Sequence, residues 1–329
     1  MTKVAICGLG RIGQVHLQNL KSLRGCEISG AFDLRAELRE HFAKSEGVRA
    51  YCSWDELIDD EESDAVIIAT PTSSHRELTL AALARDKHVF VEKPLAGTLE
   101  DAQAIVDAAG ISDRCVQVGF CERFNPQYME AKRAVAAGAL GSVRAIYSSR
   151  VAPYSLSDPS WELGVLDTAV HNFDLILWLT GGIPMTVQSR GVQLYAESAI
   201  PHTATVILQF ADGAFATDQI TWLRDSAHPL SQCARARMLV LGSRGSFEID
   251  LSQRPSALLA ADQYRMIDTV ILGAPEYYSC LKLQLEGFLR AVEEGSPVLA
   301  APADALLTER VAIAARQSLL SGGQELSLV

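Results

Sequence analysis

A glycine pattern close to the N-terminus constrains the fold more than any other segment of this chain. Residues 8–13 read Gly-Leu-Gly-Arg-Ile-Gly, directly after the apolar run Val4-Ala5-Ile6-Cys7 and directly before a helical pattern. Between a strand and a helix, G-x-G-x-x-G allows a tight turn, close approach of a pyrophosphate and close helix packing. The helix N-terminus adds N–H donors and partial positive charge. This segment therefore predicts a dinucleotide site with the following residues: Gly8, Gly10, Arg11, Ile12 and Gly13.

A second apolar run supports this interpretation. Residues 27–32 read as a strand that ends in Asp33, which follows Gly13 by 33 − 13 = 20 residues. That spacing is typical of the acid that binds the adenosine ribose hydroxyls. A carboxylate there repels a 2′-phosphate, so we expect NAD rather than NADP. Arg35 lies two residues further on and offers an alternative, since it could stack on adenine or reach a phosphate.

Size and composition set the broad class of the protein. The chain has 329 residues, enough for two domains, with 48% hydrophobic and 21% charged residues. Its net charge of −11 argues against nucleic acid or an anionic membrane as the main partner. Seven cysteines without a C-x-x-C pair predict reduced thiols and no metal site. No signal-peptide pattern precedes Val4, and no apolar run reaches the roughly 18 residues of a membrane span, so we expect a cytoplasmic protein.

The first part of the chain, residues 1–121, alternates short apolar runs with helical patterns. Such strands, apolar on both faces, are typical of a parallel sheet covered by helices. The predicted strands are Val4–Cys7, Ile28–Phe32, Ala65–Ala69, Val89–Val91 and Cys115–Val118. Residues 53–56 fit a capping box, and residues 98–101 fit a looser one. This pattern predicts an α/β, doubly wound Rossmann domain.

The pattern of predicted elements changes in residues 122–329. A helix is predicted over Gly164–Thr180, where Gly181-Gly182 ends it, and two more over Glu276–Glu294 and Ala303–Ser321. The predicted strands are Gly141–Val151, Thr186–Leu194, Ala204–Phe210, Ala214–Trp222, Arg237–Leu241 and Ser246–Asp250. Short turns between successive strands predict an α+β domain with a large, mainly antiparallel sheet, and the terminal helices could pack back on the first domain. One sheet face would be left for a partner, so we expect a homodimer or a homotetramer.

Two further segments carry groups suited to catalysis. Lys93 follows the strand 88–91 and precedes Pro94, which places it at the sheet edge where ligands bind. Asp167 and His171 lie four residues apart, on one face of the predicted helix. A carboxylate that holds one imidazole nitrogen leaves the other for proton transfer. The alternatives are a solvated lysine, a helix-capping aspartate and a histidine satisfied within the core.

Together these segments resemble the Gfo/Idh/MocA oxidoreductase family over nearly the whole chain. The matching motifs, in order, are Gly8–Gly13, Asp33, Ala69-Thr70-Pro71, Glu92-Lys93-Pro94, Val118-Gly119-Phe120 and Asp167-x-x-x-His171. Residues 165–175 and 117–124 look most like inositol dehydrogenases. The resemblance implies a Rossmann domain followed by a sheet domain, with the cofactor in the cleft between them.

The resemblance also implies a catalytic set of Lys93, Asp167 and His171. His171 would accept the hydroxyl proton while hydride leaves the carbon for the nicotinamide. Lys93 would stabilise negative charge on the substrate oxygen, and Asp167 would orient His171. The resemblance further implies cofactor contacts from residues at the strand ends: Thr70, Pro71, His75, Glu92 and Lys93. For His75 an exposed position at a helix N-terminus is the alternative.

Substrate contacts are the least determined part of the sequence. Arg123, Arg150, Tyr154 and Trp161, together with Asp167 and His171, are the candidates. Aromatic rings suit the apolar face of a sugar, and arginine suits hydroxyls or a charged group, but packing or surface ion pairs explain the first four equally well. We expect an NAD-dependent dehydrogenase of a small cyclic polyol or sugar. The alternatives are a dehydrogenase of nucleotide-linked or amino sugars, a glycosidase that uses NAD transiently, and a non-catalytic NAD(H) sensor.

Overall fold

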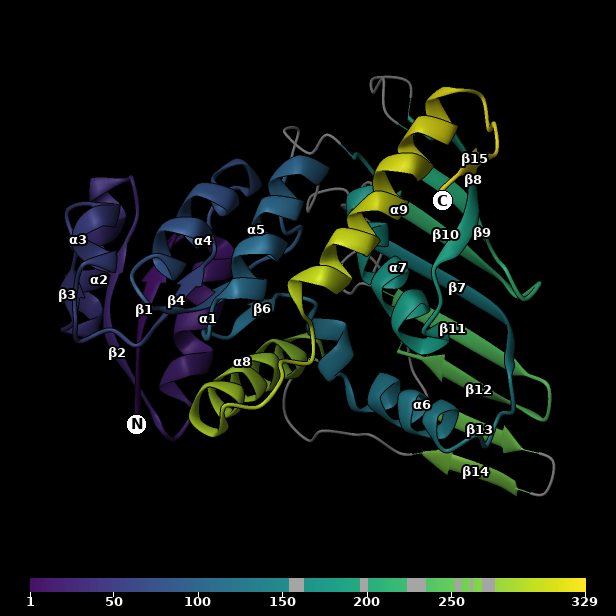
Figure 1. Cartoon of the computed structure of the whole chain (residues 1–329), viewed down its shortest axis with the longest axis horizontal. Coiled ribbons are helices and arrows are strands. Elements are labelled where there is room, and N and C mark those ends of the chain that lie inside the picture. The colour runs from purple at the N-terminus through teal and green to yellow at the C-terminus, as the bar shows by residue number, and fades with distance from the viewer. Residues whose placement is uncertain (154–162, 196–200, 224–234, 252–255, 261–262, 268–275) are drawn as a thin grey trace. The chain divides into compact units, whose positions relative to one another are not determined.

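The computed structural model divides into two compact units. It describes residues 1–153, 163–195, 201–223, 235–251, 256–260, 263–267 and 276–329 (Figure 1). The first unit comprises Met1–Phe124 and Ala274–Leu306, and the second comprises Asn125–Gly273 and Leu307–Val329. The first unit runs three residues past the expected boundary at residue 121, and it includes a late segment, in line with the expectation that terminal helices could pack back on the first domain. Among the described residues, no helix is long and apolar enough to cross a membrane.

The first unit contains a six-stranded parallel sheet, as the apolar runs predicted. Its strands are β1 (Thr2–Cys7), β2 (Cys26–Phe32), β3 (Arg49–Ala50), β4 (Ala65–Ile68), β5 (His88–Val91) and β6 (Val116–Val118). Their order is β3-β2-β1-β4-β5-β6. The strand order therefore reverses between β1 and β4, which is the switch point where doubly wound sheets bind ligands. The sequence analysis missed β3, which has two residues and no apolar run.

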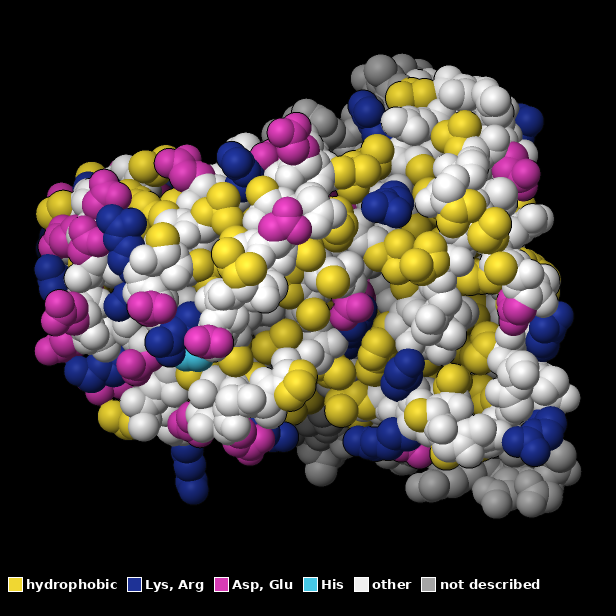
Figure 2. Space-filling view, viewed as in Figure 1, with side chains coloured by type: hydrophobic (Ala, Val, Ile, Leu, Met, Phe, Trp, Pro, Cys, Tyr) yellow, Lys and Arg dark blue, Asp and Glu magenta, His cyan; other side chains and the backbone are white. Residues whose placement is uncertain are grey.

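Helices and short turns connect these strands. They are α1 (Arg11–Lys21), α2 (Ala36–Glu46), α3 (Trp54–Ile58), η1 (Thr72–Ser74), α4 (His75–Leu83), α5 (Leu99–Ile111), η2 (Cys121–Phe124) and α8 (Glu276–Glu294). Ser53 Oγ accepts from Glu56 N at 3.1 Å, and Thr98 Oγ1 accepts from Asp101 N at 3.1 Å. Both predicted caps are thus present, so these two helix starts are fixed by local sequence. Over this unit, acidic and basic side chains are interspersed on the face that Figure 2 shows.

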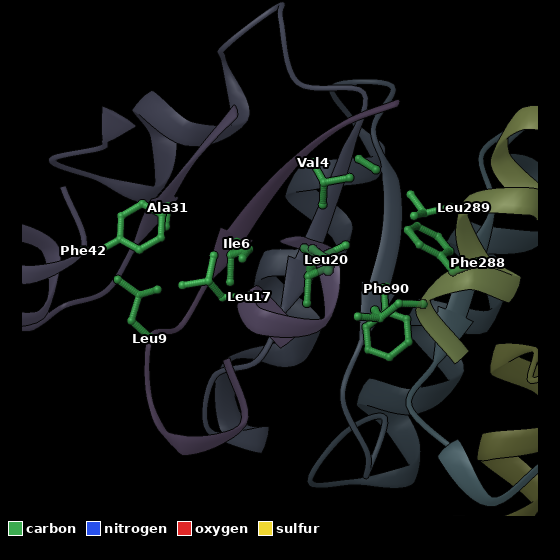
Figure 3. Packing of buried hydrophobic residues seen from close by; sticks show 13 residues of the cluster. Val4, Ile6, Leu9, Leu17, Leu20, Ala31, Phe42, Phe90, Phe288 and Leu289 are labelled. Carbon is green, nitrogen blue, oxygen red and sulfur yellow. The ribbon is translucent and has the colours of Figure 1, made fainter. Parts of the chain in front are cut away.

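The core of the first unit explains why α8 belongs to it. Buried side chains of β1 and α1, including Val4 and Leu20, form one cluster with Phe288 and Leu289 of α8 (Figure 3). The rings of Phe90 and Phe288 meet edge to face, with centroids 5.9 Å apart. Burial of large apolar side chains supplies most of the driving force for such packing. A helix close to the C-terminus therefore completes a core that the N-terminal strands begin.

The second unit contains a nine-stranded sheet that is mainly antiparallel. Its strands are β7 (Val143–Pro153), β8 (Pro184–Val192), β9 (Thr203–Phe210), β10 (Phe215–Leu223), β11 (Arg235–Gly242), β12 (Gly245–Asp250), β13 (Ser256–Ala260), β14 (Gln263–Ile267) and β15 (Leu326–Ser327). Their order is β14-β13-β12-β11-β7-β10-β9-β8-β15, and of these neighbours only the central pair, β7 and β10, is parallel. The prediction of a large, mainly antiparallel sheet is confirmed.

Three helices accompany this sheet: α6 (Pro126–Ala136), α7 (Leu166–Thr180) and α9 (Pro302–Leu320), of which α9 starts within the first unit. α7 packs against the central strands β7 and β10 (Figure 1). It ends as predicted at Gly181, whose φ of 66° is left-handed. Side chains of β9 alternate between buried and exposed, so one sheet face is covered and the other is open to solvent.

Candidate functional site

The glycine fingerprint forms a turn that has no room for side chains at two positions. Gly8 has a φ of 96°, and a Cβ there would overlap the carbonyl oxygen of Ala69 at the end of β4. A Cβ on Gly13 would overlap the carbonyl oxygen of Gly8. The turn between β1 and α1 therefore requires glycine at both places for steric reasons. This is the close approach of helix and strand that the fingerprint predicted.

The start of α1 fits the diphosphate of a dinucleotide. Its N-cap is Gly10, which is extended and provides no side-chain cap. The first-turn N–H groups of a helix have no partners within the helix, and the dipole of this eleven-residue helix adds positive charge there. Arg11 is exposed at this end, whereas Ile12 packs against the cluster formed by Cys121, Cys280 and Leu281.

Asp33 follows β2 and is held by several donors. Its Oδ2 accepts from Leu9 N at 2.8 Å, and its Oδ1 accepts from Arg35 N at 2.9 Å. The Arg35 guanidinium donates to both oxygens, with Nε 3.0 Å from Oδ1 and Nη2 3.1 Å from Oδ2. Burial raises the pKa of Asp33, but these hydrogen bonds outweigh it and hold the pKa below its ordinary value. Asp33 is thus ionised and shares its charge with Arg35, an ion pair that was not predicted from the sequence.

His75, at the start of α4, lies inside the first unit rather than at its surface. It is 1% exposed, with Nδ1 2.8 Å from Pro94 O and Nε2 3.0 Å from Thr70 O. Burial lowers its pKa, so the ring is neutral and donates one of these two hydrogen bonds. Both nitrogens face backbone carbonyls, which favours a structural link over the predicted cofactor contact. Thr70 accepts from Ser74 Oγ at 2.7 Å, and Pro71 is exposed.

Lys93 follows directly after Glu92 at the carboxyl end of β5, the edge where parallel sheets bind ligands. Glu92 is buried, and its Oε1 lies 2.6 Å from Nε2 of His16 on α1. Its Oε2 accepts from Lys93 N at 3.1 Å. The carboxylate that was expected to contact the cofactor is therefore turned towards a buried histidine. The sequence analysis missed His16, although a histidine among the buried residues of an amphipathic helix was a signal.

The second unit presents Asp167 and His171 on α7. They are 4% and 8% exposed, and their i, i+4 spacing places them on one helix face. The hydroxyl of Thr168 accepts from Trp222 Nε1 at 2.9 Å, which ties the first turn of α7 to β10. Asp174, further along α7, is fully buried. The helix prediction and the shared face are confirmed, and the roles of the two residues remain predictions.

A buried polar network holds α7 against the central strands. Asn172 donates to Asp218 Oδ1 at 2.7 Å, and Ser148 Oγ donates to the same oxygen at 2.7 Å. Arg150 Nε donates to Asn172 Oδ1 at 3.1 Å. Burial raises the pKa of Asp218, although the hydrogen bonds from Ser148 and Asn172 oppose this. Arg150, predicted to contact substrate, is only 3% exposed and lies in this network, where it donates to Asn172, the residue after His171.

The other predicted substrate residues are differently placed. Arg123 is 2% exposed and lies in the first unit, where its Nη1 donates to Leu299 O and to Asp304 Oδ2, both at 2.8 Å. These contacts favour a structural link from η2 to Leu299 and to the first turn of α9 over a substrate contact. Tyr154 and Trp161 lie outside the described residues.

Comparisons with known proteins agree with both units. A family model described as "Oxidoreductase family, NAD-binding Rossmann fold" matches residues 2–120, and the GFO/IDH/MocA C-terminal domain model matches residues 128–248. The chain is similar to the myo-inositol 2-dehydrogenase of Thermotoga maritima, with 30% identity over 96% of each chain. It is also similar to the scyllo-inositol 2-dehydrogenase (NAD(+)) of Bacillus subtilis, with 27% identity over 97% of this chain and 94% of the relative.

A solved structure extends the likeness to the fold. The crystal structure of a probable dehydrogenase from Thermotoga maritima matches with a TM-score of 0.84 at 26% identity, and covers 99% of this chain and 98% of that one. The fold of both units and the glycine turn at the start of α1 thus agree with the two family models. The chain belongs to the Gfo/Idh/MocA family of NAD-binding oxidoreductases, which act on CH–OH groups.

Proposed function

We propose that this protein is an NAD-dependent dehydrogenase that oxidises a secondary hydroxyl group of a cyclic polyol or sugar to a ketone. An inositol is the first candidate substrate, because two full-length relatives are named for oxidising myo-inositol and scyllo-inositol. The single observation that carries the reaction type is the shared face of Asp167 and His171 on α7. An imidazole beside a carboxylate is suited to reversible proton transfer near neutral pH.

Three side chains of the chain would perform the chemistry. His171 accepts the hydroxyl proton, and Asp167 orients its ring. Lys93 donates a hydrogen bond to the same substrate oxygen and stabilises the negative charge that develops there. NAD, when bound, supplies the carbon that accepts the hydride. The products are then a ketone, NADH and one proton that leaves through His171.

The cofactor would be held by backbone more than by side chains. The N–H groups at the start of α1 would bind the diphosphate, next to the tight turn at Gly8. Asp33 would bind the adenosine ribose. The ribose hydroxyls would then share the Asp33 carboxylate with Arg35. Thr70 and Pro71, directly after β4, are the further candidates at this edge.

We also propose that the protein is a cytoplasmic homodimer or homotetramer that assembles through the open face of the second sheet. Tyr147, Ile207 and Met185 are 42%, 36% and 38% exposed, and Thr217 pairs with both Tyr147 and Ile207 across neighbouring strands. Large apolar side chains gathered on one sheet face are typical of interfaces. Light scattering at micromolar concentration tests this proposal, and a monomer would contradict it.

A substrate panel tests the proposed reaction. The purified protein is incubated with NAD and with inositols, aldoses, amino sugars, sugar acids or nucleotide-linked sugars, and NADH is followed at 340 nm. We expect NADH with at least one inositol, in a 1:1 ratio to ketone. Turnover of nucleotide-linked sugars alone would overturn the substrate class. Cleavage of a glycoside without net NADH would overturn the reaction type.

A further inference from the structure

The Glu92-Lys93-Pro94 turn is fixed on two sides by buried histidines from different helices. His16 of α1 contacts the Glu92 side chain, and His75 of α4 faces the carbonyl oxygen of Pro94. Both histidines lie within the first unit, and each is at most 1% exposed. The turn that carries Lys93 is thus held by two distant residues. His16 is 76 positions from Glu92, and His75 is 19 positions from Pro94.

The His16–Glu92 pair is a short, buried hydrogen bond. A carboxylate accepts hydrogen bonds, so the tautomer of His16 with a proton on Nε2 is the one that donates to Glu92 Oε1 across 2.6 Å. His16 Nδ1 has no hydrogen-bond partner within the part of the chain that the structure describes. A buried pair of this kind costs desolvation, and an apolar residue would fill the same space at least as well. Packing of α1 alone therefore does not explain a histidine at this position.

The second carboxylate oxygen of Glu92 contacts the backbone of Lys93. This oxygen, Oε2, accepts from the N–H of Lys93 at 3.1 Å. On the opposite side lies Gly119, where a Cβ would be only 2.8 Å from the same oxygen. The carboxylate is therefore confined between His16, the backbone of Lys93 and the glycine. Any shift of the carboxylate would be transmitted to the backbone from which the Lys93 side chain extends.

We propose that His16 is a positioning residue for Lys93, which it holds in place through the Glu92 carboxylate. This inference rests on the proposed function of Lys93. The hydrogen bond of His16 fixes the orientation of Glu92, and Glu92 fixes the peptide of Lys93. His75 supports the same turn from the Pro94 side.

Two variants of similar size separate the hydrogen bond from the volume of His16. His16→Gln keeps a donor for Glu92, whereas His16→Leu fills the space without one. We expect His16→Leu to lower kcat about ten- to a hundredfold with little change in the Kd for NAD, since small misplacements of catalytic groups have effects of this size. His16→Gln should stay within about threefold of the unaltered protein, because the donor is retained. Equal kcat values for the two variants would overturn the proposal.

The Lys93→Ala background distinguishes positioning from a general structural effect. If His16 acts through Lys93, then His16→Leu has no further effect on kcat once Lys93 is alanine. An equal fall in kcat in both backgrounds would show a structural role and overturn the proposal. If Lys93→Ala alone leaves turnover intact, the proposed function fails instead, so the two failures are distinguishable.

A measurement on the free enzyme covers the case in which activity is too low to compare. Hydrogen–deuterium exchange of the Lys93 amide reports its bond to Glu92 directly. We expect exchange roughly tenfold faster in His16→Leu than in His16→Gln, because the carboxylate is released. If His16→Leu does not fold, the double variant His16→Leu/Glu92→Gln removes the unpaired charge but keeps an oxygen acceptor, and its Lys93 amide should exchange faster than that of Glu92→Gln alone. Unchanged protection of the Lys93 amide would contradict the proposal.

Discussion

The two regions that carry the proposed chemistry are built in opposite ways. Asp167 and His171 share a face because they are four residues apart on one helix, so a single element sets their geometry. Lys93 instead lies on a turn after β5, and its place depends on Glu92, His16 and other residues from separate elements. A helix face is specified locally, whereas a turn requires partners from elsewhere in the fold. Substitutions far from Lys93 in sequence should therefore affect it more than comparable ones affect the α7 pair.

The largest effect is expected at His171. His171→Ala removes the proposed base and should lower kcat about 10²- to 10⁴-fold, the usual contribution of a general base. The measurement is NADH formation at 340 nm with the best substrate of the panel. The Kd for NAD, measured by fluorescence, serves as the control and should stay within about threefold, since other residues hold the cofactor. Turnover equal to that of the unaltered protein would exclude His171 from the reaction.

Asp218 tests how α7 is anchored. Asp218→Ala removes the oxygen that accepts buried hydrogen bonds from Ser148 Oγ and Asn172 Nδ2. The free energy of unfolding should fall by about 2–5 kcal/mol, because two buried donors lose their acceptor. Chemical denaturation measures this value. Thr217→Ala, at the neighbouring position on the other sheet face, is the matched control and should cost less than about 1 kcal/mol.

The same carboxyl predicts a pH dependence of known sign. Burial raises the pKa of Asp218 in the folded protein above that of the unfolded chain. The folded state thus binds a proton more readily, and Asp218 makes stability rise as the pH falls through the folded pKa towards about 3.9. Asp218→Asn lacks this titration, so the unaltered protein should gain stability relative to the variant as the pH falls. A stability difference that is constant with pH would show that Asp218 does not titrate in this way.

A substitution at Gly119 tests whether the Glu92 carboxylate next to Lys93 is confined. In Gly119→Ala the added methyl group would lie 2.8 Å from Glu92 Oε2, so the carboxylate must shift. We expect a loss of about 1–3 kcal/mol in the free energy of unfolding, typical of overpacking. Gly97→Ala, outside any helix and at a position where a Cβ meets nothing within 4 Å, is the control. If both glycine variants unfold at the same denaturant concentration, the carboxylate is not confined as described.

The smallest effect is expected at Arg35. Its guanidinium side chain is 55% exposed and shares the charge of Asp33. Arg35→Gln leaves that charge less balanced, so the ratio of the Kd for NADP to the Kd for NAD should rise about two- to fivefold, on the scale of an exposed ion pair. Isothermal titration with both cofactors measures the ratio. A much larger rise would instead mark Arg35 as a ligand for a 2′-phosphate, and an unchanged or lower ratio would show that Arg35 does not balance the charge of Asp33.

Local patterns made much of this molecule predictable. The predicted strand Val4–Cys7 lies within β1, and the prediction of residues 276–294 as a helix matches α8, because periodicity and turn residues are local properties. Side-chain partners were not predictable in the same way. Arg123 and Asp304 are 181 residues apart in sequence, and no local pattern links them. The same holds for His16 and Glu92, and for Arg150 with Asn172 and Asp218.

The shortest elements were not predicted from the sequence, for a different reason. The two residues of β3 and the two of β15 carry no periodic signal, so only their pairing with β2 and β8 defines them as strands. The helix α6 was also missed, although Asn125 accepts from Gln127 N and Pro126 follows it. An asparagine cap followed by proline is a recognised helix start, so this signal was available in the sequence.

Lys93 and His171 are proposed to act on one hydroxyl group of the substrate. A double-mutant cycle on kcat tests this proposal, with Lys93→Ala, His171→Ala and the double variant compared on one substrate. Residues that act as a unit show losses that do not multiply, so the double variant should be about as slow as the slower single variant. Losses that multiply would contradict the proposal and show that the two side chains act independently.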